Sequence, residues 1–414
     1  MKKPMVDAVV IGGGAAGTLC AALAAGRGLK VVLLEPNREL GRKLRITGKG
    51  RCNVTNDCTP REFIEAIPGD GRFLQSAIHK FSPQDAMAFF EGLGVPLKTE
   101  RGRRVFPVSD KAGDIAGALT RLCHKNGVEI LREKANEILL GADGVRAVKT
   151  ERGEIACRNA VICTGGLSYP GTGSTGDGYG LAKSLGHSVS ECRPSLVPLE
   201  SPDAYCREMQ GFSLRNVTLS AYENDKLIYK ELGEMLFTHF GVSGPLVLSA
   251  SAHMRHFGEA KYRLNIDLKP GLDEKKLDAR ILRDLEKYHN REFANCLNDL
   301  AGKAMIPVLV RLSGIPETLR ANSVTREQRQ NLVRLFKAFP VEISRPRPVA
   351  EAIVTSGGVS TREIDPRSMM SKLVPGLYFA GEVMDLDAYT GGYNLQIAWS
   401  TAFVAANSLR TEDK

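Results

Sequence analysis

The stretch Gly12-Gly13-Gly14-Ala15-Ala16-Gly17 decides the fold of this chain. It follows Val6–Ile11, an apolar run typical of a buried parallel strand, and it opens an alanine-rich segment that predicts a helix over Ala15–Gly26. In the pattern Gly12-x-Gly14-x-x-Gly17, the first glycine permits a tight turn and the second lets the backbone approach a pyrophosphate. The third lets helix and strand pack closely. This order therefore predicts a nucleotide whose phosphates lie at a helix N-terminus.

An acidic residue completes the unit. The second strand, Lys30–Leu34, ends at Glu35, which stands 18 residues after Gly17. A carboxylate at this place is positioned to accept hydrogen bonds from both ribose hydroxyls of an adenosine. The glycine pattern alone would also fit a purely structural turn, but strand, helix and acid together predict a βαβ dinucleotide-binding unit.

The carboxyl-terminal part indicates which dinucleotide binds. A strand over Leu377–Ala380 leads to Gly381 and Glu382, and a carboxylate there can hold the ribityl hydroxyls of a flavin. Gly391-Gly392 then precedes a predicted helix over Asn394–Leu409, whose first N–H groups would face the negative charge of a reduced flavin ring. We therefore expect one FAD, held between residues 12–17 and 381–394.

The segment Gly41–Asn56 is rich in glycine and cations, which predicts a loop rather than a helix. Arg42 or Lys43 is placed to neutralise the pyrophosphate, and the alternative is a solvated basic loop. Cys52 and Cys58 raise a second alternative, a redox disulfide, although their spacing is not that of a C-x-x-C pair. We expect Cys52 to be a small residue packed near the cofactor.

Bulk composition sets broad limits on the protein. The net charge of +9 favours polyanionic partners such as phosphorylated cofactors or nucleic acid, but it also fits a role in solubility alone. Nine cysteines without metal-ligand spacing predict a reducing, cytoplasmic location and no metal site. No apolar run approaches the roughly 18 residues of a membrane helix, so we expect no membrane association. No feature of the sequence specifies an oligomeric state.

The 414 residues are enough for two or three domains, and an insertion interrupts the α/β pattern. We expect a discontinuous FAD-binding domain over residues 1–193 and 346–414, a β domain over 194–271 and a helical domain over 272–345. The β part is predicted from alternating runs that include Val217–Tyr222, Lys226–Glu231, Glu234–Phe237 and Tyr262–Leu268.

The helical part of the insertion is predicted from apolar residues at helical spacing. Leu277, Ile281 and Leu285 fall on one helix face. Thr325 and Gln328 form a capping box for a second helix, expected to carry Leu332, Leu335 and Phe339.

Four residues are candidates for lining a substrate site, and none is assigned a catalytic role. His239 lies in a glycine-rich segment of the insertion, where it is either a lid residue or a packed side chain. Tyr169, Thr355 and Tyr393 are equally plausible. No Ser/His/Asp order or paired-carboxylate pattern supports hydrolytic chemistry.

These motifs resemble the bacterial FAD-dependent NAD(P) oxidoreductase family that includes aminoacetone oxidase and the BaiN-like bile-acid enone reductases. The matching stretches span nearly the whole chain: residues 12–17, 41–56, 164–178, 355–359, 371–372 and 381–394. The resemblance implies a glutathione-reductase-like Rossmann domain interrupted by a β-barrel-like piece and a helical piece. One departure from the family pattern is Lys49, where many members have glycine. This difference weakens the inference that the chain shares a substrate with its relatives.

The resemblance also implies the FAD contacts. They would include residues of both ends of the chain and of the basic segment: Gly12, Gly14, Ala15, Ala16, Gly17, Glu35, Arg42, Lys43, Gly50, Asn53, Thr164, Gly165, Gly381, Glu382, Asn394, Leu395 and Gln396. Ala135 falls where related flavoproteins read adenine with a backbone pair.

Several activities are compatible with this family. We expect NAD(P)H to drive hydride transfer through FAD to a conjugated C=C bond. Its binding should be transient, because the sequence has no visible second glycine-rich βαβ unit. The alternatives are an oxygen-using amine oxidase, a flavin-dependent reductase of uridine in ribosomal RNA, and a non-enzymatic flavin sensor. The partner would be a small molecule or ribosomal RNA.

Overall fold

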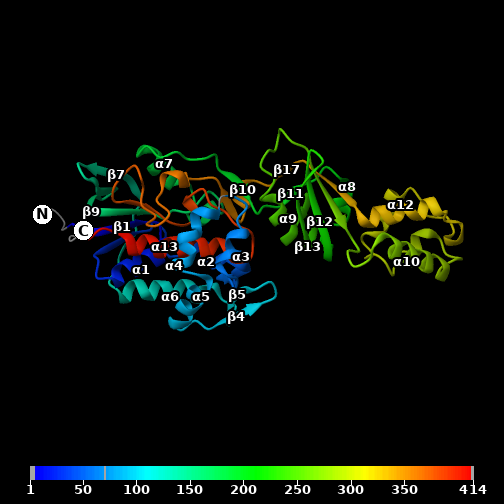
Figure 1. Ribbon diagram of the computed structural model, residues 1–414, viewed down its shortest axis with the longest axis horizontal. Coiled ribbons are helices and arrows are strands. Elements are labelled where there is room, and N and C mark those ends of the chain that lie inside the picture. The colour runs from blue at the N-terminus through cyan, green and yellow to red at the C-terminus, as the bar shows by residue number, and fades with distance from the viewer. Residues whose placement is uncertain (1–4, 70, 412–414) are drawn as a thin grey trace. The chain divides into compact units, whose positions relative to one another are not determined.

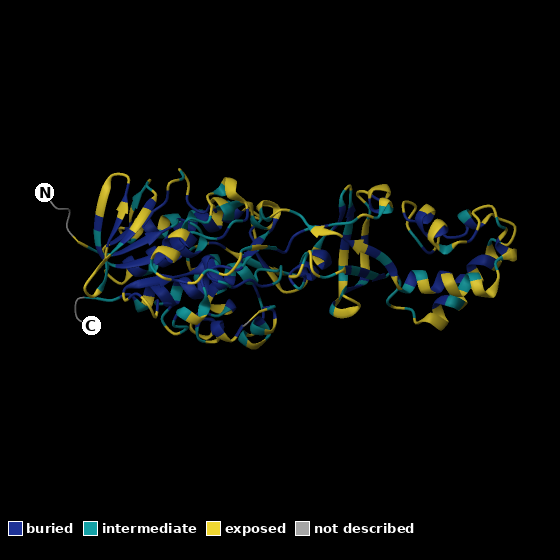
Figure 2. Cartoon of the chain, turned by 90° about the horizontal axis from the view of Figure 1, so that it is seen from above, coloured by how far each residue is buried: buried dark blue, intermediate teal, exposed yellow. Residues whose placement is uncertain are grey.

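The computed structural model describes residues 5–69 and 71–411 (Figure 1). The chain divides into two compact units, one formed by Met1–Ser195 with Val349–Lys414 and the other by Leu196–Pro348. Each unit has its own apolar core, and Figure 2 shows the buried residues gathered inside each of them.

A parallel sheet forms the centre of the first unit. Five parallel strands follow the order β6-β2-β1-β9-β19, and two antiparallel strands, β8 and β7, extend from β9. The bounds are β1 Val6–Ile11, β2 Val31–Leu34, β6 Glu129–Leu131, β7 Ala135–Gly141, β8 Gly144–Thr150, β9 Gly153–Ile162 and β19 Leu377–Phe379.

The register of this sheet brings distant parts of the sequence to one edge. Ile11 pairs with both Leu34 and Ile162, and Ile162 pairs with Phe379. The carboxyl ends of these parallel strands therefore lie side by side, which is where ligands of open α/β sheets bind.

Helices from both ends of the chain cover the sheet. Helix α1 (Ala15–Gly26) packs against α13 (Tyr393–Ser408) and α6 (Ala112–Lys125). The predicted carboxyl-terminal helix is thus confirmed. Its Trp399 is fully buried and donates from Nε1 to the Val54 carbonyl at 2.9 Å, which ties α13 to the segment after α2.

Segment 41–56 corrects one expectation, because α2 (Arg42–Gly50) begins as a helix. The helix breaks at Thr47, Gly48 and Lys49, whose backbone angles are not those of a right-handed helix. The glycines thus end the helix after one and a half turns instead of preventing it.

The rest of the first unit consists of short elements. A small antiparallel sheet has the order β3-β5-β4, and β10 pairs with β18. The remaining elements named below are β3 Thr55–Asn56, α3 Pro60–Glu65, α4 Gln75–Lys80, α5 Pro83–Gly92, β4 Leu97–Glu100, β5 Arg104–Pro107, α7 Asp177–Ser184, β10 Arg193–Ser195 and β18 Val354–Ser356.

The second unit is built on an antiparallel sheet of order β16-β15-β12-β13-β14-β11-β17. Its strands are β11 Leu199–Glu200, β12 Ser213–Glu223, β13 Lys226–Thr238, β14 Gly241–Ser243, β15 Tyr262–Asp267, β16 Phe339–Ile343 and β17 Arg345–Pro346. The two strands predicted over 226–237 are one continuous strand, β13, because β12 pairs with it from Lys226 to Leu236.

Helices complete the second unit: α8 Ala204–Glu208, α9 Pro245–Ser251, α10 Glu274–Lys287, α11 Ile306–Ser313 and α12 Arg326–Lys337. The buried face of α10 and the Thr325–Gln328 capping box are confirmed. Phe339 was expected on α12 but lies in β16, because the helix ends at Lys337 and Phe339 pairs with Ile266. The strands and helices share one core.

Candidate functional site

The glycine turn of the first unit leaves space for a ligand at one glycine only. A Cβ at Gly12 would lie 2.6 Å from the Cys163 carbonyl oxygen, and one at Gly17 would lie 1.8 Å from the Gly12 carbonyl oxygen. By contrast, a Cβ at Gly14 would meet no atom within 4 Å. Helix α1 begins there without a side-chain cap, so the first N–H groups, over Ala15 and Ala16, are available to an anion.

Glu35 is held at the edge of the sheet beside this turn. The residue is 9% exposed, and its carboxylate accepts the Gly13 N–H at 2.8 Å. The other carboxylate oxygen accepts the backbone and side-chain N–H groups of Asn37, at 2.9 and 2.7 Å. Arg42 donates to the Asn37 side chain at 2.6 Å. Because a carboxylate has about four acceptor positions, Glu35 retains capacity for one further donor.

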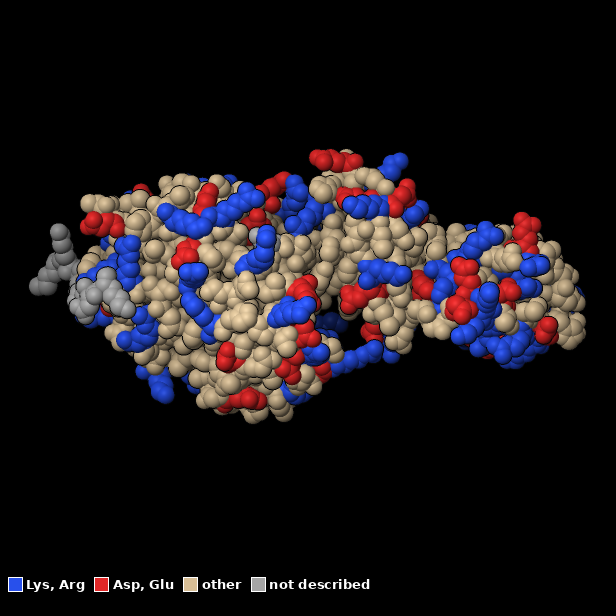
Figure 3. Space-filling view, in the orientation of Figure 1, with Lys and Arg blue, Asp and Glu red and all other residues tan. Residues whose placement is uncertain are grey.

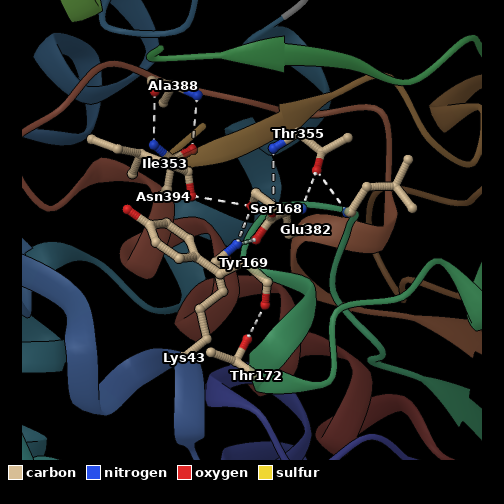
Figure 4. Close-up of polar contacts among 10 residues, drawn as sticks. Lys43, Ser168, Tyr169, Thr172, Ile353, Thr355, Glu382, Ala388 and Asn394 are labelled. Carbon is tan, nitrogen blue, oxygen red and sulfur yellow. Dashed lines mark hydrogen bonds and ion pairs between the residues drawn. The ribbon is translucent and has the colours of Figure 1, made fainter. Parts of the chain in front are cut away.

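Lys43 and Glu382, 339 residues apart, meet in an ion pair of 2.7 Å (Figure 4). Lys43 also donates to the Ser168 hydroxyl at 2.6 Å, and Ser168 donates to Glu382 at 3.1 Å. Glu382 accepts the Thr355 backbone N–H at 3.0 Å. One hydrogen-bond network thus connects two predicted FAD contacts, Lys43 and Glu382. It also includes Ser168, in the segment after β9, and β18.

The sequence prediction missed Ser168 in this network. The residue lies inside the 164–178 motif, next to Tyr169, but the three long-range contacts of its hydroxyl depend on segments far apart in the chain, which local sequence does not encode. The hydroxyl of Thr355 accepts the N–H groups of Leu167 and Ser168, at 2.8 and 3.2 Å, and its role at a substrate stays a prediction.

Tyr169 is exposed and held in a left-handed conformation, at φ 53°. Its carbonyl accepts both the N–H and the hydroxyl of Thr172, at 2.8 and 2.7 Å, as Figure 4 shows for the hydroxyl. Tyr393, in contrast, packs its ring against Phe63 with 5.5 Å between centroids.

The start of α13 is a close-packed junction. A Cβ at Gly392 would lie 2.3 Å from the Thr55 backbone, and the helix has no side-chain cap. Asn394 donates to the Ala388 carbonyl at 2.7 Å and accepts the Ala388 N–H at 2.9 Å. Gln396 is fully buried and bonded to Thr55 and Phe81, while Leu395 is half-buried. The Asn394 and Gln396 side chains are therefore bonded within the protein and stabilise this junction. The predicted cofactor contacts that remain at the start of α13 are backbone N–H groups.

Asn53 and Thr164 carry the strongest sign of a ligand. The Asn53 Oδ1 and Thr164 Oγ1 atoms are buried and have no hydrogen-bond partner within residues 5–69 and 71–411. Buried polar groups without partners are costly, so a donor from a bound cofactor would lower the cost at these two predicted contacts. Gly165, next to Thr164, has φ 72°, and Gly50 is exposed with no atom near its Cβ position.

Two further expectations concern Ala135 and a disulfide between Cys52 and Cys58. Ala135 begins β7, where it pairs with Thr150. Cys52 and Cys58 are both buried and free, which argues against a disulfide between them. Burial raises the pKa of the Cys52 thiol to about 12 and that of Cys58 to about 11, so neither is a thiolate at neutral pH.

These residues fit FAD as the bound group. The uncapped start of α1 suits a pyrophosphate, and Glu35 suits a ribose. The unpartnered Asn53 oxygen suits a donor on the cofactor. Gly381 follows β19 with φ 78°, and its Cβ position lies 2.9 Å from Ala16, so this backbone comes close to the start of α1.

His239 belongs to the second unit and lies between β13 and β14. Its side chain is exposed, its ring contacts Phe240 edge-on, and its carbonyl accepts a bond from Arg207. A role for His239 at a substrate stays a prediction.

Among the described residues, no group of three or more His, Cys, Asp or Glu side chains is arranged to hold a metal, and no helix is long and apolar enough to cross a membrane.

Comparison with known proteins agrees with this site. The family model described as HI0933-like protein Rossmann domain matches residues 6–408. The ribosomal RNA dihydrouridine synthase of Escherichia coli K12 is 32% identical and covers 97% of this chain and 98% of its own. The 3-dehydro-bile acid delta(4,6)-reductase of Clostridium scindens is 30% identical and covers 96% and 98%.

A solved structure shows the same fold. The 3-ketosteroid-delta4-(5alpha)-dehydrogenase of Rhodococcus jostii RHA1 matches with a TM-score of 0.53 at 14% identity, covering 98% of this chain and 97% of that one. The resemblance stated from the motifs is confirmed. The chain therefore belongs to the HI0933-like family and is an FAD-dependent oxidoreductase.

Proposed function

We propose that this protein reduces a C=C bond conjugated to a carbonyl group, with NAD(P)H as the electron donor. One observation carries the proposal. Two relatives that match nearly the whole chain are named for the same chemistry, since dihydrouridine arises by saturating the conjugated C=C of uridine and a delta(4,6)-reductase saturates conjugated C=C bonds of a 3-keto bile acid. The substrate class is therefore an α,β-unsaturated carbonyl compound.

The residues of the first unit support this role by binding and orienting the cofactor. FAD, when bound, supplies hydride transfer between the nicotinamide and the substrate. The start of α1 would hold the pyrophosphate, Glu35 the ribose, and Glu382 the ribityl chain. The uncapped start of α13 would stabilise negative charge near the flavin ring.

The absence of a dedicated nicotinamide domain fits transient binding of NAD(P)H. Within the described residues, the unit Leu196–Pro348 has an antiparallel sheet where a glutathione-reductase-like protein would need a second parallel βαβ unit. NAD(P)H would then bind, reduce the enzyme and leave before the substrate enters.

Anaerobic stopped-flow spectroscopy tests the proposal. We expect NADPH or NADH to bleach the flavin absorbance near 450 nm (roughly the usual flavin maximum). Adding 2-cyclohexen-1-one or a 4-en-3-one steroid should restore the absorbance with formation of the saturated ketone. If neither nicotinamide bleaches the flavin, the proposed donor is wrong. If an amine bleaches it and oxygen restores it with peroxide release, the amine oxidase alternative replaces the proposal.

A second candidate, reduction of uridine in ribosomal RNA, has support from the Escherichia coli relative and from the net charge of +9. Lys and Arg side chains lie over both units, interspersed with Asp and Glu (Figure 3). Dihydrouridine in ribosomal RNA should then disappear from cells that lack the gene. Affinity for ribosomal RNA should also fall steeply between about 50 and 200 mM salt. A flat salt response would contradict this candidate.

A further inference from the structure

We propose that Arg51 is a positioning residue that fixes the turn Thr47–Asn53 and thereby aims the Asn53 amide at FAD. The proposal concerns how the cofactor is held, so it stands whichever substrate the enzyme reduces. Arg51 itself would not touch the cofactor and would act through Asn53.

The turn has an unusual concentration of left-handed backbone. Gly48, Lys49 and Gly50 have φ values of 57°, 59° and 84°, and Cys52 has 62°. Glycine accepts this conformation readily, but Lys49 and Cys52 carry a Cβ and are strained. Such strain persists only where the surrounding structure imposes it, and it gathers at functional sites.

The side chain of Arg51 makes the interactions that hold the turn in place. Its Nε donates to Asp110 at 2.8 Å, and the guanidinium also pairs with Glu100. The guanidinium carbon lies 4.1 Å from the centre of the Phe106 ring. Lys98 binds Asp110 at 2.7 Å, which makes a network of two cations and two carboxylates. A network with a stacked, forked Arg is firmer than an isolated surface pair.

The network is anchored outside the turn. Glu100 ends β4, Phe106 belongs to β5, and Asp110 follows β5, so all three lie outside the 47–53 segment. Arg51 therefore adds a side-chain connection between the turn and the β3-β5-β4 sheet, which the backbone itself enters at Thr55.

Asn53 is fixed between two constraints. On one side lies the clamped Arg51, with the Cys52 N–H bonded to the Thr47 carbonyl at 3.0 Å. On the other side the Val54 N–H donates to the Val105 carbonyl of β5 at 2.8 Å. The Asn53 Oδ1 atom is buried between these constraints with no partner among the described residues. It is an acceptor, and FAD offers donors at its ring N–H and its hydroxyls.

The test measures the FAD dissociation constant of purified protein by flavin fluorescence. N53A should raise the dissociation constant by about 10- to 100-fold, the loss expected for one buried hydrogen bond. R51M should raise it comparably, and R51K should recover part of the loss. Because Arg51 acts through Asn53, the double variant R51M/N53A should bind FAD no more than about threefold more weakly than N53A, as expected for coupled residues.

A matched control separates positioning from general stability. Arg329 also makes a two-pronged bond to a carboxylate, at 2.6 and 3.2 Å to Asp278, but it lies in the second unit. R329M should lower the unfolding temperature of the FAD-free protein and leave FAD affinity unchanged. If R51M does not fold, the pair E100Q and D110N removes the same ion pairs with smaller changes.

Two results would overturn the proposal. One is an unchanged FAD dissociation constant in R51M or in the E100Q/D110N pair. The other is a double variant in which the separate losses of R51M and N53A multiply, because that would show independent action. Failure of NAD(P)H to reduce the flavin would contradict the proposed function and leave these binding measurements intact.

Discussion

Glu35 illustrates how many backbone and side-chain contacts a single side chain can organise. Its two oxygens accept three N–H groups from Gly13 and Asn37. In E35Q an amide NH₂ would face one of these donors, and a charge-assisted bond would be lost. We expect a loss of about 1–3 kcal/mol in unfolding free energy and weaker FAD binding. Thermal unfolding with and without FAD measures both, with E39Q, at a carboxylate 67% exposed, as the neutral control.

His187 predicts how stability depends on pH. It is buried, its Nδ1 lies 3.1 Å from Glu363 and its Nε2 lies 2.9 Å from Ser371. Burial lowers its pKa below the usual 6.5, and the neighbouring Glu363 opposes this only partly. As the pH falls through 6.5, His187 therefore binds a proton more readily in the unfolded chain than in the folded chain. The free energy of unfolding decreases as a result.

The variant H187Q isolates this effect. Its unfolding temperature should lie below that of the wild type at pH 7.5, and the gap should narrow as the pH falls to about 5.5. H124Q, at an exposed histidine, should parallel the wild type throughout. A gap that does not change with pH would show that His187 contributes through packing alone.

At the scale of elements, different glycines of the Gly12–Gly17 turn are expected to serve FAD binding and folding. Gly14 has room for a methyl group, and its φ of −77° suits any residue. G14A should therefore fold with a stability within about 0.5 kcal/mol of the wild type, yet lose FAD affinity because the methyl group enters the space left for the phosphates.

Gly17 should behave in the opposite way. Its Cβ would overlap the Gly12 carbonyl oxygen, so G17A should lose about 3 kcal/mol or more and separate α1 from β1. G180A, at an open and exposed position of α7, is the control and should gain up to about 1 kcal/mol. Equal stability of G14A and G17A would contradict the packing argument.

The predictability of each element follows from the range of its interactions. The unit β1-α1-β2 and helix α13 follow from local periodicity and glycine placement. The end of α12 before Phe339 does not, because pairing with Ile266 of β15 decides it. Likewise, the Lys43–Ser168–Glu382 network and the Arg51 clamp join residues separated by 49 to 339 positions, which no local pattern reports.

At the scale of the whole molecule, the two units predict separable roles. A variant in which a short Gly-Ser linker replaces Leu196–Pro348 should fold and bind FAD, because every predicted FAD contact and a complete core lie in the first unit. The chain supports the join, since Ser195 pairs with Val354 across β10 and β18. We expect the variant to lose enone reduction, because His239, the candidate lid residue over the substrate, is removed with the insertion.

Flavin stoichiometry and NADPH-dependent reduction of 2-cyclohexen-1-one measure these two properties. Residues 196–348 expressed alone should fold and bind no flavin. Loss of FAD from the linker variant would show that the insertion helps to build the cofactor site.

The placement of β19 and α13 also dictates an order of events during synthesis. Translation releases the chain from its amino terminus, and domains fold as units once their residues emerge. The insertion is contiguous in sequence, so it can fold while Val349–Lys414 is still unmade. The parallel sheet must wait for its last strand, and Glu382 and the start of α13 arrive with it. Flavin capture therefore has to follow synthesis of residues 377–394, and a ribosome that stalls before residue 377 leaves a folded insertion and an incomplete cofactor site.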